Sequence, residues 1–183
     1  HIRLGTAIQQ LAGRPPTMAA MQAATIDALA GGDRVIIGIG MSGPQIVEGW
    51  FGQPWGKPYY QMKDYVSIIK KTLRREIVEH EGRAISLPYT GDGSLGIGKP
   101  LKSILHMNPN IPVWLGTGTE TMVRLTGEIA DGWLPLRMTP EYLETAKPWL
   151  TEGAEKVGKS LSDIEIQSGV QVHITDDVQQ AID

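Results

Sequence analysis

Three glycines with the spacing G-x-G-x-x-G, Gly38, Gly40 and Gly43, follow an apolar run. In dinucleotide-binding proteins these glycines open a helix whose N-terminus holds a pyrophosphate, and an acidic residue about 20 positions later binds the ribose from a strand end. Asp64 has nearly that offset, but the apolar spacing around it is helical. Pro44 also follows the last glycine directly. The pattern therefore favours a glycine-rich strand end, or a loop for another cofactor, over a nicotinamide site.

The other catalytic signatures are incomplete. Residues 93–99 spell G-x-x-x-x-G-K, but Pro100 occupies the position of the Ser or Thr that binds magnesium in phosphate-binding loops. The four histidines lack the spacing of metal ligands, and Ser42 does not stand in a G-x-S-x-G context. The chain contains no cysteine. We therefore expect no metal site, no thiolate chemistry and no serine triad.

Small or hydroxylated residues end four expected strands, at residues 4–8, 38–43, 115–120 and 133–137. In a (β/α)8 barrel the C-terminal ends of the strands build the active site. Glycine and serine there allow a flat cofactor to approach the backbone. The amides of residues 116–119, which precede a helix, are suited to a phosphate. The strand ends thus indicate one cofactor site.

Alternating strand and helix patterns must position these ends. We expect buried or half-buried strands at residues 2–8, 34–40, 111–118, 131–136 and 164–174. We expect helices at residues 18–30 after the N-cap Thr17, at 60–74, at 119–130, from Pro140 onward with a kink at Pro148, and from residue 175.

Between these elements, residues 76–87 predict a hairpin that turns at Glu81 and Gly82, and the glycine-rich residues 88–102 predict an insertion. The βα order favours a parallel α/β architecture, and both a doubly wound sheet and a barrel are compatible with it. A barrel takes about 250 residues. The 183 residues would therefore form part of one.

Longer strings resemble a known family. The strings "GIGMSGPQIVEGWFGQPWGKP" and "LGTGTETMVRLTGEIADGWLP" are similar to those of the bacterial-luciferase-like superfamily, and of its deazaflavin (coenzyme F-420)-dependent oxidoreductase branch. The resemblance implies a TIM-like (β/α)8 barrel. Residues 1–183 would be one incomplete barrel domain of about five strands, roughly strands 3 to 7, with an insertion at about residues 76–110. The first two strands and the last strand of the family's barrel have no counterpart in the sequence.

The resemblance also implies an activity. Members transfer hydride to or from a small organic substrate with coenzyme F-420, or use FMN and oxygen as monooxygenases. A truncated barrel that only binds flavin or serves a structural role is a further alternative, and a nicotinamide dehydrogenase would rest on the glycine spacing alone. In the family a strained, often cis, peptide presses on the cofactor ring, and Ala7–Ile8 has the matching position.

The resemblance and the strand ends together predict the site residues. The expected cofactor-binding residues are Ala7, Ile8, Gly38, Gly40, Met41, Ser42, Gly43, Gln45, Gly116, Thr117, Gly118, Thr119 and Trp133. Gln45 and Glu48 are the candidates for proton handling, although Glu48 also fits a solvated loop carboxylate. The aromatic loop at residues 50–55 is expected to line a hydrophobic substrate pocket, or to pack for structure or at a subunit contact.

The composition narrows the partners. A net charge of -3 and a pI near 5.8 do not indicate a nucleic-acid or anionic-membrane partner. No apolar run approaches the roughly 18 residues of a membrane span, and residues 1–10 do not resemble a signal peptide. We therefore expect a cytoplasmic protein. An incomplete barrel leaves open strand edges, so we also expect a homo-oligomer or further chain segments that complete the barrel.

Overall fold

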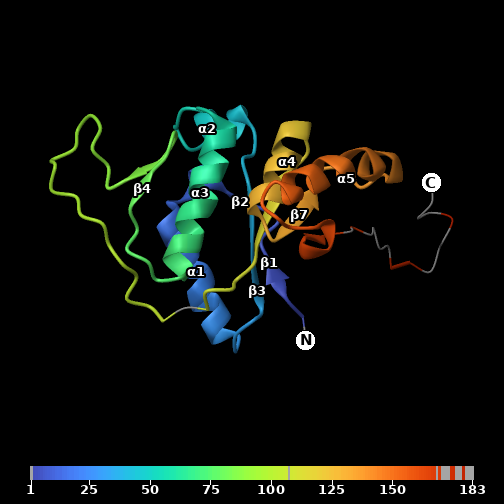
Figure 1. The fold of residues 1–183 in the computed structure, drawn as a ribbon, viewed down its shortest axis with the longest axis horizontal. Helices are drawn as coiled ribbons and strands as arrows, with labels where there is room; N and C mark the ends of the chain where they lie inside the picture. Colours follow the sequence, from blue (N-terminus) through green and yellow to red (C-terminus); the bar gives the residue numbers. More distant parts are fainter. Residues whose placement is uncertain (1, 107, 168, 170–173, 176–178, 180–183) are drawn as a thin grey trace.

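The chain folds into one curled parallel sheet covered by helices (Figure 1). The computed structural model describes residues 2–106, 108–167, 169, 174, 175 and 179. The strand order is β1-β3-β6-β7-β8, and β2 pairs with β3 beyond β1. The bounds are β1 Leu4–Gly5, β2 Gln9–Gln10, β3 Val35–Gly40, β6 Val113–Thr117, β7 Gly132–Pro135 and β8 Glu165–Ile166. Because every pair is parallel, the carboxyl ends of the strands lie at one edge of the sheet.

Two groups of helices cover the convex face of this sheet. Helices α1 (Pro16–Leu29) and α3 (Pro58–Leu73) pack on β3 and β6 through a core that includes Ile37, Ile39 and Leu115. Helices α4 (Glu120–Ile129) and α5 (Pro140–Glu155) pack around Trp133 of β7. Figure 1 shows these two groups on either side of β3. The alternate strand residues form a separate cluster of Ile36, Trp114 and Leu134 on the concave face.

Proline begins helices α1, α2 (Pro44–Gly49), α3 and α5. Proline suits the first helical position because the N–H that it lacks has no partner there and its φ is already helical. The sequence prediction was wrong at two of these starts. Helix α1 begins at Pro16 without a cap from Thr17, and Pro44 begins the short helix α2 where a loop was expected. Thr139 caps α5 by accepting a hydrogen bond from the Tyr142 N–H, and α5 continues through Pro148.

The first predicted strand differs most from expectation. Residues 2–8 were expected to form one buried strand, but the chain forms the short strands β1 and β2 on either side of a cis peptide bond between Ala7 and Ile8. Leu4 is 57% exposed, because β1 lies at the edge of the sheet, where β3 is its one neighbour among the described strands. By contrast, all of β3 is buried, as the run of β-branched residues predicted.

The segment between α3 and β6 contains the predicted hairpin. Strands β4 (His80–Glu81) and β5 (Ser86–Leu87) pair antiparallel, with the turn at residues 82–85. A 3-10 turn η1 (Leu11–Gly13) precedes α1, and a second, η2 (Leu161–Asp163), precedes β8. Residues 88–102 project from the body as an extended arm (Figure 1). The predicted strand at residues 164–174 is a strand over β8, while residues 168 and 170–173, and most of the predicted helix from residue 175, lie outside the described residues.

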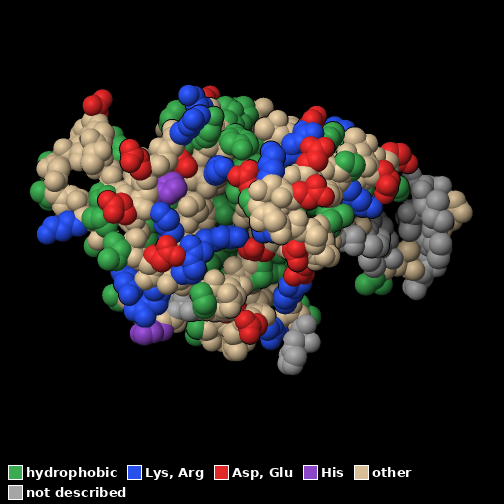
Figure 2. Space-filling view, in the orientation of Figure 1, with side chains coloured by type: hydrophobic (Ala, Val, Ile, Leu, Met, Phe, Trp, Pro, Cys, Tyr) green, Lys and Arg blue, Asp and Glu red, His purple; other side chains and the backbone are tan. Residues whose placement is uncertain are grey.

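Charge is mixed on the molecular surface. Figure 2 shows acidic and basic side chains interspersed over the face that it presents, with no large region of one sign. In the part of the chain that the structure describes, none of the helices combines the length and the apolar character that crossing a membrane requires.

Candidate cofactor site

A cavity of about 670 Å³ lies at the segment between β1 and β2 and at the carboxyl ends of β3, β6 and β7. It is lined by Ala7, Ile8, Gly40, Met41, Ser42, Trp55, Pro58, Gly116, Thr117, Gly118, Thr119, Met122, Leu134, Pro135, Leu136 and Gln167. Nine of the predicted cofactor residues thus meet at one site, although they come from three segments, 7–8, 40–42 and 116–119, spread over more than 100 residues. Its volume lies in the range of about 300–1,000 Å³ that is typical of small-molecule sites.

Ile8 forms the floor of the cavity over two paired glycines. Gly40 and Gly116 are neighbours in the register of β3 and β6. A Cβ at Gly40 would lie 2.7 Å from Ile8 Cδ1, and one at Gly116 would lie 2.8 Å from Ile8 Cγ2. The glycines therefore make room for Ile8 rather than directly for a flat ring, which corrects the physical reason inferred from the sequence. The cis bond at Ala7–Ile8 has the geometry that the resemblance implied.

Gly38 lies one layer below the cavity and does not line it. The Thr6 hydroxyl donates to the Gly38 carbonyl at 2.7 Å and accepts from the Gly38 N–H at 3.0 Å. A Cβ at Gly38 would lie 1.7 Å from the Thr6 carbonyl oxygen. Gly38 is thus required for the close approach of the β1–β2 segment to β3.

The segment 116–119 forms one side of the cavity and is held from the helix side. Trp133 Nε1 donates to the Thr117 carbonyl at 3.1 Å, and the Tyr142 hydroxyl donates to the Gly118 carbonyl at 2.9 Å. Burial raises the pKa of Tyr142, so that its phenol stays protonated and able to donate. Thr119 is the N-cap residue of α4, but its side chain makes no capping bond, so the hydroxyl and the first-turn amides of α4 are available to a ligand.

Trp133 was predicted to contact the cofactor, but the structure places its side chain elsewhere. It is fully buried between the sheet and helices α4 and α5, on the convex face. The residue after it, Leu134, points to the concave face and lines the cavity. The alternation of strand side chains explains the difference, since neighbouring residues face opposite sides of a sheet. Trp133 therefore acts on the site through Thr117.

Gly43, Gln45 and Glu48 also lie outside the cavity lining. Gln45 and Glu48 are exposed on α2. Glu48 Oε1 accepts a hydrogen bond from the backbone N–H of Trp55 at 3.4 Å. The carboxylate thus holds the loop that brings Trp55 to the cavity. Their proton-handling role, which no contact in the described residues tests, stays a prediction.

Several lining residues were not among the predicted cofactor residues. Trp55 belongs to the aromatic loop that was expected to line a substrate pocket, whereas Trp50 of the same loop is 81% exposed and lines no part of the cavity. Met122 lines the cavity from α4. Gln167 follows the end of β8, and the strand-end rule missed it because the strand was expected to continue to residue 174.

The lining combines apolar side chains and backbone groups with the uncharged polar side chains of Ser42, Thr117, Thr119 and Gln167. None of the lining residues carries an ionisable side chain. Across the described ranges, no three His, Asp or Glu side chains gather as the ligands of a metal ion would. Such a cavity fits a flat organic ring over Ile8, with a polar or phosphate-bearing group at Gly118 and Thr119.

Known proteins are similar to this chain in sequence and in fold. The family model for luciferase-like monooxygenases matches residues 1–183. A Mycobacterium tuberculosis protein that bears the name of a coenzyme F-420-dependent oxidoreductase is 44% identical over 181 residues, which are 97% of this chain and 52% of that protein. The chain spans about half the length of the curated relatives it matches.

Solved structures agree with the sequence comparison. The structure of the coenzyme F-420-dependent tetrahydromethanopterin reductase from Methanopyrus kandleri superposes with a TM-score of 0.72 at 28% identity, over 90% of this chain and 48% of that one. The FMN complex of the oxygenating constituent of Pseudomonas putida 3,6-diketocamphane monooxygenase shares the fold, with a TM-score of 0.67 at 16% identity, over 91% of this chain and 48% of that one. The curled sheet is therefore about five strands of the barrel that the resemblance implied, and the chain belongs to the luciferase-like monooxygenase family.

Proposed function

We propose that this protein is an oxidoreductase that transfers hydride between coenzyme F-420 and a small organic substrate. One observation carries the proposal: an apolar cavity built over Ile8 at the strand ends, in a chain 44% identical to a protein named as an F-420-dependent oxidoreductase. The composition of the lining supports it. Hydride transfer needs no side-chain nucleophile, because the bound cofactor supplies the ring that accepts or gives the hydride.

The lining residues would bind and orient the cofactor. Ile8 and Leu134 offer an apolar surface on the concave side of the sheet, and Met41 and Trp55 enclose the cavity from the α2–α3 side. Together they exclude water from the reacting face, which protects a hydride donor from side reactions. At the other end, the amides at Gly118 and Thr119 and the N-terminus of α4 would hold a phosphate.

Proton handling must come from outside the lining. Gln45 and Glu48 remain the proposed candidates, since both lie on α2, next to the loop that borders the cavity. A small movement of that loop would be needed to release Glu48 from the Trp55 N–H. We also propose that further chain segments or a second copy complete the barrel, and that the protein acts in the cytoplasm, in keeping with the absence of cysteine.

Titration of the purified chain tests the proposal. We expect F-420 to bind with a micromolar Kd, measured by the change in its fluorescence. Leu136→Glu, which adds a negative charge to the cavity side next to Gly118, should weaken binding at least about tenfold, because it repels an anionic cofactor. The matched control is Ile77→Glu, at an exposed position outside the cavity lining, which should leave the Kd unchanged.

FMN is the alternative cofactor, and likeness to an FMN-containing monooxygenase supports testing it. Tighter binding of FMN than of F-420, with oxygen consumption by the reduced complex, would favour the monooxygenase reading. Micromolar binding of either cofactor without turnover of any substrate would favour a flavin-binding or structural barrel. If neither cofactor binds, the cavity does not serve the proposed reaction.

A further inference from the structure

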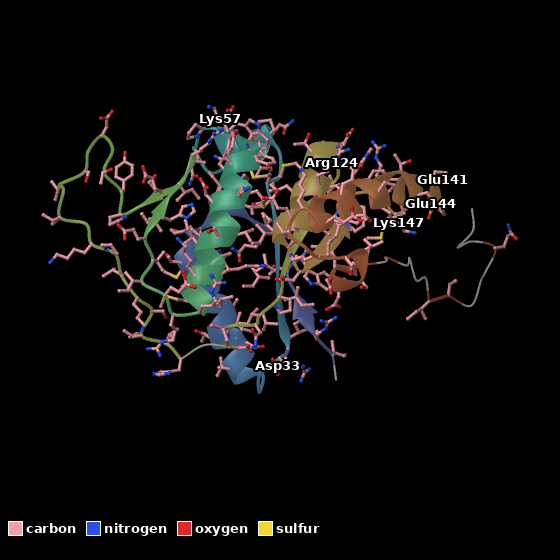
Figure 3. The ribbon with its side chains drawn as sticks, viewed as in Figure 1. Asp33, Lys57, Arg124, Glu141, Glu144 and Lys147 are labelled. Carbon is pink, nitrogen blue, oxygen red and sulfur yellow. The ribbon has the colours of Figure 1, made fainter. Side chains whose placement is uncertain are left out.

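A second cavity, of about 430 Å³, adjoins the candidate cofactor cavity. Met41 lines both cavities and so forms part of the wall between them. The loop between α2 and α3 borders both as well, with Trp55 on the first cavity and Gln53 and Pro54 on the second. Lys57, labelled at the upper end of α3 in Figure 3, ends this loop. A molecule in the second cavity would therefore lie next to the proposed cofactor, with the flexible thioether side chain of Met41 in the wall between them.

The apolar walls of the second cavity come from three elements. Leu11 belongs to η1, Val47 to α2 and Ile85 to the turn of the β4–β5 hairpin. The hairpin is fastened to α3, because Asp64 Oδ2 accepts from the backbone N–H groups of Ala84 and Ile85 at 2.8 and 3.0 Å. The cavity is thus bordered by a hairpin that is bonded to α3, and residues 88–102 of the projecting arm take no part in its lining.

Most polar groups of this cavity already have partners. The Tyr65 hydroxyl donates to the Arg14 carbonyl at 3.0 Å and accepts from Gln9 Nε2 at 3.2 Å. Burial raises the pKa of Tyr65 to about 12, so the phenol is neutral at physiological pH. Gln53 Nε2 donates to the Ala12 carbonyl at 3.1 Å.

Gln61 is different. It lines the second cavity from α3, its side chain makes no hydrogen bond to the described residues, and its Oε1 is buried without a partner. An amide carries both an acceptor and donors. A small rotation of this side chain would let it accept from a hydroxyl or donate to a carbonyl, which are the two oxidation states of an alcohol and ketone pair.

Charge in the lining is confined to one exposed residue. Among the lining residues, which include no Asp, Glu or Lys, Arg14 alone is charged, and its guanidinium donates to the Gln22 side chain. A ligand carboxylate would lose its hydration and find as its counter-charge only the exposed Arg14 guanidinium, which is already bonded to Gln22, and an ammonium would find no opposite charge in the lining. The lining therefore suits an uncharged molecule.

We propose that the second cavity binds the uncharged body of the organic substrate, with a hydroxyl or carbonyl oxygen hydrogen-bonded to the Gln61 amide and the apolar part packed on Val47, Ile85 and Met41. The role of this ligand as the substrate rests on the proposed function, whereas the binding of an uncharged ligand in the cavity does not. The two statements can therefore fail separately.

Binding of small probes to the full chain tests the site. Cyclohexanol and cyclohexanone are the neutral probes, and cyclohexanecarboxylate is the charged probe, each followed by ligand-observed NMR with and without saturating F-420. We expect the neutral probes to bind in the millimolar range and to bind together with F-420. The carboxylate should bind at least tenfold more weakly. Equal binding of the carboxylate, or displacement of the neutral probes by F-420, would overturn the proposal.

Two variants locate the bound probe. Ala84→Trp adds bulk at an exposed hairpin position that lines only the second cavity, and should abolish probe binding while the Kd for F-420 stays unchanged. Ser86→Trp, on the same hairpin and lining neither cavity, is the matched control and should bind the probes normally.

Gln61→Met keeps the volume of the side chain but removes its hydrogen-bonding groups, and should weaken cyclohexanol binding about fivefold, the loss expected for one hydrogen bond. If Ala84→Trp fails to fold, Gln61→Met still tests whether the probe binds in the second cavity. Probe binding that neither Ala84→Trp nor Gln61→Met reduces would contradict this site. If the wild-type protein binds the neutral probes as expected but does not bind F-420, the proposed function is wrong and the second cavity remains a ligand site.

Discussion

Gly38 is required for the site although it has no side chain of its own and does not line the cavity. Its missing side chain leaves space for the Thr6 carbonyl, and its own backbone groups exchange two hydrogen bonds with the Thr6 hydroxyl. This contact joins β1 to β3 immediately before the cis bond that places Ile8 in the cavity. The role of Gly38 is therefore to position the cavity floor.

Gly38→Ala should lower the free energy of unfolding by about 3 kcal/mol, because a Cβ would overlap backbone atoms that cannot rotate away. Urea unfolding followed by circular dichroism measures the change. Gly49→Ala is the control, since Gly49 ends α2 with nothing within 4 Å of an added Cβ. It should leave stability unchanged or raise it by up to about 1 kcal/mol. Equal stabilities for the two variants would contradict the tight contact at Gly38.

Asp27 holds the amino end of β3, the strand that contains Gly38. Its buried carboxylate accepts hydrogen bonds from the backbone N–H groups of Asp33, Arg34 and Val35 and from the side chain of Asn108. Burial acts to raise the pKa of Asp27, but these hydrogen bonds outweigh it and hold the pKa below its ordinary value. Asp33, labelled near the lower end of α1 in Figure 3, adopts a positive φ of 55° in this turn. Asp27 thus fixes the turn that leads from α1 into β3.

Asp27→Asn should destabilise the protein by about 2 kcal/mol at pH 7, because an amide NH2 cannot accept from several backbone donors. The lowered pKa means that the carboxylate of the folded protein stabilises it above about pH 4, the ordinary value, and that this stabilisation is lost as the pH falls through the folded-state pKa. Unfolding free energies between pH 7 and pH 3 should therefore fall less steeply for the variant. Asp92→Asn in the exposed arm is the control; the prediction fails if both variants follow the wild-type curve.

Helices α4 and α5 illustrate how one element places another. They approach with backbone in contact, since a Cβ at Gly127 would lie 2.1 Å from the Leu150 carbonyl oxygen and one at Gly153 would lie 1.9 Å from the Arg124 carbonyl oxygen. Arg124, labelled in Figure 3, adds an ion pair to Glu152 at 2.6 Å. Because α4 begins at the cavity, its contact with α5 also sets the position of the proposed phosphate site.

Gly153→Ala should separate these helices and lower stability by about 3 kcal/mol. It should also weaken F-420 binding, because the N-terminus of α4 moves with the helix. Thermal unfolding and the fluorescence titration measure the two effects. The control is Glu144→Ala on the exposed face of α5, where the ion pair with Lys147 contributes at most about 1 kcal/mol (Figure 3). A Gly153→Ala variant with wild-type stability would show that the helices have room to adjust.

At the scale of the whole molecule, the chain leaves much apolar surface uncovered. Leu29, Leu95 and Ile104 are each 84% exposed, on α1, the arm and the segment that follows it. The sheet has edges at β1 and β8, and the ion pair between Arg3 and Glu165 joins residues of these two ends. Exposed apolar surface and free strand edges favour association with other chains.

We therefore expect the 19.9 kDa chain to self-associate. Sedimentation velocity over a range of concentrations should give a mass that rises above that of the monomer. Leu29→Glu and Ile104→Glu should reduce the association, because each replaces exposed apolar surface with charge. Glu141→Gln, on α5, should have no effect. A monomer at every concentration would contradict the expected oligomer.

The sequence alone was enough to predict the parallel βα order, helices α3 to α5, the hairpin and most of the residues at the cavity. The elements follow from local periodicity and turn chemistry, and the meeting of the strand ends follows from the rule that parallel strands bring their carboxyl ends to one edge. The individual cofactor residues, Ala7 and Ile8 among them, were predicted from the family resemblance together with these strand ends. Local reasoning failed at α2, where Pro44 was taken to oppose a helix, and at Trp133, whose side of the sheet depends on register.

Only the tertiary structure decided what occupies the space beside each residue. Gly38 meets Thr6 from 32 positions away, Ile8 fills the space over Gly40 and Gly116, and Gln61 is left unpaired beside a second cavity. The G-x-G-x-x-G motif therefore marks the end of a barrel strand, where Gly38 makes room for Thr6 and Gly40 makes room for Ile8. The physical reason is that packing joins atoms distant in sequence, so the purpose of a missing side chain becomes evident only from the group that fills its place.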